Sequence, residues 1–113
     1  MAGQSGIDPS IAEWIEARQD EIARALRASR YAARQGDRQR ETLDLLTHLA
    51  EIHRASRDAI HLLTGYAVRG QVASATQVAA ASGTTVSTAT SRAGSPVTHR
   101  VWADVYPDGR ATP

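Results

Sequence analysis

TQVAAASGTTVSTATSRAG, residues 76–94, contains eight Ser or Thr residues and only one charged side chain, Arg92. Such a composition hydrates easily and is typical of a linker. The spacing of its small residues nevertheless favours two short helices. Ala79 is small enough for two helices to cross closely, Gly83 permits a positive φ in a sharp turn, and Thr85 can cap a following helix. We therefore expect a helix, a turn and a second helix in this stretch.

The pair Val78 and Ala79, three further residues, Gly83 and then the run VSTATSR resemble the helix-turn-helix of bacterial and phage regulators over residues 75–94. In that family the second helix enters the major groove of DNA, where its first residues meet base edges and its hydroxyls contact phosphates. The resemblance implies that Ala89 packs inward. It also implies a DNA-binding surface made of Thr76, Gln77, Thr85, Val86, Ser87, Thr90, Ser91, Arg92 and Arg100.

The charge of this stretch is low for a DNA-binding motif. No positively charged residue occurs from Gln71 to Ser91, although Lys and Arg supply most of the nonspecific affinity for DNA. We expect the affinity to come from Arg69, Arg92 and Arg100, from an Arg-rich turn earlier in the chain, or from dimerisation. Two other interpretations stay open, a linker and a helical interaction module in which the motif only packs.

Two long helices are predicted ahead of this stretch, within residues 9–69. In each of them apolar residues recur at the helical period and form a stripe along one side. Gly36 and Asp37 separate the two helices with a stop and a new start. The second helix also carries Leu43, Leu46 and Leu62 outside its main stripe, so it needs a further partner, either the C-terminal part of the chain or another subunit. We expect an antiparallel helical hairpin that dimerises.

A β-strand is predicted after the motif, in VTHRVWADVY, residues 97–106. Val97, Val101 and Val105 alternate with polar or aromatic residues at a period of two. Because a single strand leaves its N–H and C=O groups unpaired, we expect it to pair with the same strand of a second chain. A β-wing that brings Arg100 to DNA is the alternative.

Composition limits the remaining possibilities. The chain has 113 residues, no Cys and a formal net charge of +1, which indicates one globular chain without disulfides or thiolate metal sites. Its first residues, MAGQSGIDPS, lack a basic start and an apolar run, so a cytoplasmic location is expected. His48 and His53 are five residues apart and point away from each other on a helix, so they cannot share a metal ion.

Together these features predict a mainly α protein: a flexible N-terminus (1–8), a helical hairpin (9–69), a helix-turn-helix (70–95), and a C-terminal strand and tail (96–113). The expected function is sequence-specific binding of double-stranded DNA by a homodimer, as a small bacterial or phage regulator. We expect no enzymatic activity, no cofactor, no metal and no membrane partner. The sequence indicates neither the DNA target nor an effector.

Overall fold

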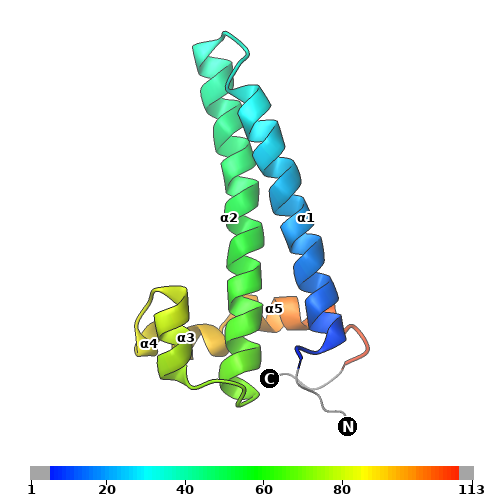
Figure 1. Ribbon diagram of the computed structural model, residues 1–113, viewed down its shortest axis with the longest axis vertical. Helices are drawn as coiled ribbons and strands as arrows, with labels where there is room; N and C mark the ends of the chain where they lie inside the picture. The colour runs from blue at the N-terminus through cyan, green and yellow to red at the C-terminus, as the bar shows by residue number, and fades with distance from the viewer. Residues whose placement is uncertain (1–5, 110–113) are drawn as a thin grey trace. The chain divides into compact units, whose positions relative to one another are not determined.

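The computed structural model describes residues 6–109 and is helical, as expected from the sequence. Its five helices are α1 (Pro9–Ala32), α2 (Arg38–Arg69), α3 (Ala75–Ser82), α4 (Val86–Ala93) and α5 (Pro96–Val105). Figure 1 shows two long helices followed by three short ones. The prediction of a mainly α protein is confirmed, whereas no β-strand occurs within residues 6–109. Residues 1–5 of the expected N-terminal segment and 110–113 of the expected tail lie outside the described residues.

Local capping residues set the bounds of the two long helices. Asp8 begins α1, because its carboxylate accepts the N–H of Ser10 at 2.9 Å, and Pro9 follows at the first helical position. Between the two helices Gly36 takes a φ of +76°. Asp37 then begins α2 by accepting the N–H of Arg40 at 3.1 Å.

The chain forms two compact units that divide within α2, between Arg57 and Asp58. In the first unit α1 and the earlier part of α2 run in opposite directions and are joined by a short turn (Figure 1). The buried residues Ala25, Ser29 and Ala32 of α1 are small and lie on one helical face. Small side chains on such a face allow two helix backbones to approach closely.

Three leucines of the first unit are not covered by the fold. Leu43, Leu46 and Leu49 of α2 are 54%, 58% and 52% exposed. They follow one another at intervals of three residues, so they form an apolar stripe along the helix. An apolar stripe in water is a common place for association with another protein chain.

The second unit contains the last part of α2 together with α3, α4 and α5. Leu62 of α2 and Val101 of α5 are fully buried in the folded chain. Trp102 and Tyr106 are nearly buried, and their ring centroids lie 5.0 Å apart. At this spacing of four residues the two aromatic rings share one helical face.

The predicted strand at residues 97–106 is wrong, because residues 96–105 form α5. Ser95 caps this helix by accepting the N–H of Thr98 at 3.2 Å, and Pro96 takes the first helical position. The valines in this segment recur every four residues, so their pattern fits a helix as well as an alternating strand. A helix satisfies its own backbone groups, whereas a strand needs a partner. Neither strand pairing across a dimer nor a β-wing therefore applies.

Within the described range, no helix has the length and hydropathy that crossing a bilayer requires.

Candidate nucleic-acid interface

Helix α3 is fixed at its start by a reciprocal pair of hydrogen bonds. The hydroxyl of Ser74 accepts the N–H of Gln77 at 3.1 Å, and the carboxamide of Gln77 accepts the N–H of Ser74 at 2.9 Å. This capping box satisfies two backbone donors that would otherwise lack a partner. The start of α3 is therefore encoded by four consecutive residues.

The connection from α3 to α4 is a turn of three residues, 83–85. Gly83 is left-handed, with φ of +67°, and the N–H of Thr84 reaches the carbonyl of Ala79 at 2.9 Å. These are the features of a glycine-terminated helix. Thr85 then caps α4, because its hydroxyl accepts the N–H of Thr88 at 3.1 Å. Polar contacts on both sides of the turn thus fix where one helix ends and the next begins.

The inward face of the two short helices is made of alanines. Ala79 of α3 is 4% exposed, and Ala89 and Ala93 of α4 are 0% and 3% exposed. Methyl side chains allow helices to pack with their backbones close together. Val78 of α3 is half-buried.

The outward face carries most of the residues that the sequence indicated for DNA. These side chains are exposed: Thr76, Gln77, Thr85, Val86, Ser87, Thr90 and Ser91. On α4, Val86, Ser87, Thr90 and Ser91 fall within about 140° of arc, at 100° per residue. Ala89 and Ala93 lie outside that arc and are buried. Arg92, at the last turn of α4, is half-buried.

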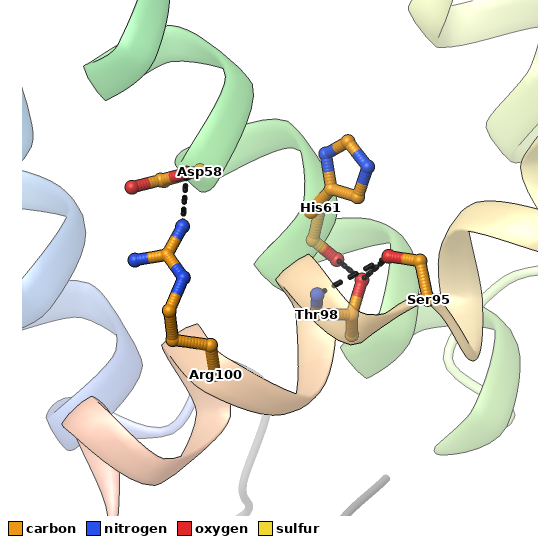
Figure 2. A network of polar contacts seen from close by, with 5 residues as sticks. All are labelled: Asp58, His61, Ser95, Thr98 and Arg100. Atoms are coloured by element: carbon orange, nitrogen blue, oxygen red, sulfur yellow. Dashed lines mark hydrogen bonds and ion pairs between the residues drawn. The ribbon is translucent and has the colours of Figure 1, made fainter.

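Helix α5 is attached to α2 by a buried hydroxyl, drawn in Figure 2. Thr98 is 0% exposed, and its hydroxyl donates to the carbonyl of Arg92 and, at 3.3 Å, to that of His61. The hydroxyl of Ser95 lies 3.2 Å from the same oxygen. Sequence reasoning did not find this network, although Ser95 followed by Pro96 was an available signal for the start of a helix.

Arg100, expected on DNA, has a partner within the second unit (Figure 2). Its guanidinium lies 3.1 Å from the carboxylate of Asp58. The Arg100 side chain is 53% exposed and that of Asp58 is 16% exposed. This ion pair holds α5 to α2, so phosphate binding by Arg100 would compete with an existing contact.

Arginine side chains also occur near the last turn of α4. A Cβ built on Gly94 would lie 3.2 Å from Nη1 of Arg69, so the guanidinium of Arg69 is close to that glycine. Arg92 belongs to the same end of α4. The C-terminal end of a helix attracts cations, which stabilises both groups there.

The second unit lacks acidic residues over most of its length. Between Asp58 and Asp104 the chain contains no Asp or Glu and three arginines, Arg69, Arg92 and Arg100. The absence of carboxylates means that the face of α4 does not repel a polyanion. Uncharged hydroxyls with cations at one end are compatible with a phosphate backbone.

The described residues show no arrangement for metal chemistry. Among residues 6–109, no three His, Cys, Asp or Glu side chains are grouped so that they could hold a metal ion. His48 lies 3.4 Å from the carboxylate of Glu51, one turn away on the same helix.

Comparisons with models of known protein families, with curated proteins and with solved structures give no match for this chain.

Proposed function

We propose that the protein binds double-stranded DNA in a sequence-dependent manner, with α4 in the major groove and α3 behind it. The observation that carries this proposal is the exposed hydroxyl face of α4. This face follows a short turn in which Gly83 caps the end of α3 and Thr85 caps the start of α4. Ser and Thr hydroxyls can donate to or accept from base edges, and an apolar side chain such as Val86 can meet a thymine methyl group.

The number of available cations sets the expected salt dependence. Arg69 and Arg92 lie at the same end of α4, whereas Arg100 is paired with Asp58. A dimer would then offer about four phosphate contacts, which gives a slope of log affinity against log salt of about −4. Such a shallow slope means that contacts to bases and hydroxyls must supply a larger share of the affinity than in a strongly basic protein.

Dimerisation would bring two copies of α4 to successive major-groove segments. Leu43, Leu46 and Leu49 form an exposed apolar stripe on α2, and the proposal assigns this stripe to contact with a second copy. Two copies of α4 would need a separation of about 34 Å, one turn of B-DNA. The second copy would also double the number of arginines near the phosphates.

The test begins with selection of duplexes from a random pool by the purified chain. Affinity for the selected duplex is then measured by fluorescence anisotropy between about 50 and 200 mM salt. Arg92→Ala is expected to reduce the slope by about 2 per dimer, because one phosphate contact is lost in each chain. Ser87→Ala is expected to change the preferred sequence and to leave the slope unaltered. Arg54→Ala, an exposed arginine of α2 that is remote in sequence from the Arg-rich turn, serves as the matched control.

One observation favours a second candidate, a non-enzymatic interaction module in which α3 and α4 only pack. The stretch from Gln71 to Ser91 has no cation, while the leucine stripe on α2 is exposed. The same experiment separates the two candidates. If no duplex is enriched, or if Ser87→Ala and Arg92→Ala bind as the unaltered chain does, DNA binding by α4 is refuted.

A further inference from the structure

Six arginines gather at the end of the first unit where α1 turns into α2 (Figure 1). This Arg-rich turn, residues 24–40, contains only one acidic residue, Asp37, whose carboxylate accepts the N–H of Arg40. All six arginine side chains are exposed: Arg24, Arg27, Arg30, Arg34, Arg38 and Arg40. The Arg-rich turn therefore presents a strongly positive surface to water.

The positive charge of this surface is not neutralised within the fold. Arg40 lies 3.7 Å from the carboxylate of Asp44. The other five arginines make no ion pair with any of residues 6–109. Arg24, Arg27 and Arg30 follow one another at intervals of three residues, so their like charges are neighbours on α1 and repel. A bound anion would relieve this repulsion.

Helix dipoles account for only part of the cluster. The C-terminal end of a helix attracts cations, which explains Arg30 in the last turn of α1. Arg24 and Arg27 precede that turn, where the influence of the dipole has fallen off. Arg38 and Arg40 lie in the first turn of α2, where the dipole disfavours a positive charge. Stabilisation of the helix ends is therefore not a sufficient reason for these four arginines.

An exposed aromatic ring lies among the arginines. Tyr31 is 73% exposed, the largest value among the large apolar and aromatic side chains of the described chain. At 100° per residue, Arg24, Arg27 and Tyr31 fall within about 60° of arc on α1. A ring that is held in water between cations gains little from packing and is free to stack on a planar group.

The same side of α1 is acidic toward the start of the helix. Glu13, Glu16 and Asp20 lie on the stripe that Arg24 and Tyr31 continue, within about 80° of arc. Carboxylates repel a polyanion, so they restrict a bound polyanion to the Arg-rich turn.

We infer that the Arg-rich turn binds single-stranded nucleic acid, with phosphates on the exposed arginines and a base stacked on Tyr31. The guanidinium group suits phosphate, because its planar fork donates two parallel hydrogen bonds. A single strand fits better than a duplex, because only an unpaired base can leave its neighbours and stack on a protein ring. The inference is independent of duplex binding by α4, since every residue that carries it belongs to the first unit.

The experiment measures binding of the full chain to a fluorescent oligothymidylate of about 15 nucleotides by fluorescence anisotropy. An abasic strand of the same length keeps the phosphates and lacks the bases. Oligothymidylate is expected to bind about fivefold or more tightly than the abasic strand. With about four phosphate contacts, log affinity should fall with log salt at a slope of about −3. Equal affinities for the two strands would overturn the inference.

Variants of Tyr31 test the stacking contact. Tyr31→Ala should weaken oligothymidylate binding about fivefold or more and leave the abasic strand within about twofold. Tyr31→Phe keeps the ring and should bind both strands as the unaltered chain does. Equal losses for the two strands would assign Tyr31 to the shape of the turn, and an unaltered affinity of Tyr31→Ala for oligothymidylate would exclude stacking on this ring.

Arginine variants test the phosphate contacts. Arg24→Ala combined with Arg27→Ala should reduce the salt slope by about 1.4, because each phosphate contact contributes about 0.7. Arg54→Ala removes an exposed arginine of the same unit outside the Arg-rich turn and should leave the slope unchanged. Equal slopes for the double variant and this control would refute phosphate binding at the turn. Arg92→Ala should leave oligothymidylate binding within about twofold, so this result stays separate from the duplex test of α4.

Lipid vesicles separate a nucleic acid from an anionic membrane surface. An anionic bilayer also attracts arginines, and Leu26 and Leu43 are exposed near the Arg-rich turn. Cosedimentation with phosphatidylserine and phosphatidylcholine vesicles is measured at the ionic strength of the anisotropy titration. We expect the chain to bind oligothymidylate under conditions in which it does not sediment with the vesicles. Binding to the vesicles without binding to oligothymidylate would replace the nucleic acid with a lipid surface.

Discussion

Replacing Thr98 with Val tests whether a buried hydroxyl holds the second unit together. Val has nearly the shape of Thr, so the substitution removes the hydroxyl and leaves the packing volume almost unchanged. The hydroxyl of Thr98 is fully buried and contacts the carbonyls of Arg92 and His61 and the hydroxyl of Ser95. Loss of this group removes the contacts of α5 to the carbonyl of His61 in α2 and to the end of α4, while the ion pair of Arg100 with Asp58 stays in place.

The expected size of the effect follows from which partners stay satisfied. A buried hydrogen bond contributes about 0.5 to 1.5 kcal/mol net, and leaving a partner unsatisfied adds to the loss. The carbonyl of Arg92 still accepts the N–H of Ser95 at 3.2 Å, and Ser95 still caps the N–H of residue 98. The cost of leaving buried groups unsatisfied is therefore only partly incurred. We expect the free energy of unfolding to fall by about 1.5 kcal/mol.

Urea unfolding followed by circular dichroism at one protein concentration measures this change, since concentration affects any chain that associates. Thermal unfolding should show a midpoint lower by about 6 °C. The matched control is Thr90→Val on α4, where the side chain is exposed and a change within about 0.5 kcal/mol is expected. If Thr98→Val is as stable as the control, the hydroxyl network does not hold α5 in place.

Three further substitutions test other parts of the structure. Gly83→Ala should lower the free energy of unfolding by about 1 kcal/mol, because the backbone there has a φ of +67°. An added Cβ would meet no atom within 4 Å, so the cost comes from the backbone alone. Gly6→Ala, where an added Cβ also meets no atom within 4 Å, is the control in the same urea titration. Ala89→Leu should cost about 1 to 3 kcal/mol by overpacking a residue with no exposed surface, and equal stability to Ala80→Leu would contradict close packing of α4. Leu46→Glu should shift sedimentation toward a single chain if the leucine stripe contacts a second copy, and an unaltered sedimentation coefficient would exclude that face.

Local sequence chemistry was sufficient where a helix begins or ends through its own neighbours. Thr85 caps α4 and Gly83 ends α3 at the positions that the spacing indicated. Such contacts join residues only two to five apart, so they can be read from one short segment. The mainly α character of the chain followed from the helical period of the apolar residues within residues 9–69.

The sequence was misleading at residues 97–106, where two periods fit the same residues. Val97, Val101 and Val105 satisfy an alternating strand and also a helix with one apolar residue every fourth position. Ser95 and Pro96 favour the helix over the strand, because Ser95 caps the first turn of α5 and Pro96 takes its first position. Because α5 satisfies its own backbone groups, the partner strand that the sequence interpretation required is unnecessary.

By itself, the sequence determined the capped helix and turn around Gly83, the exposed hydroxyls that follow it and the lack of charge from Gln71 to Ser91. Tertiary structure alone decided that Arg100 pairs with Asp58 and that Thr98 is buried with its hydroxyl on the carbonyl of His61. The physical reason is distance along the chain. Caps depend on adjacent residues, whereas this ion pair and this buried hydroxyl depend on groups that only packing brings together.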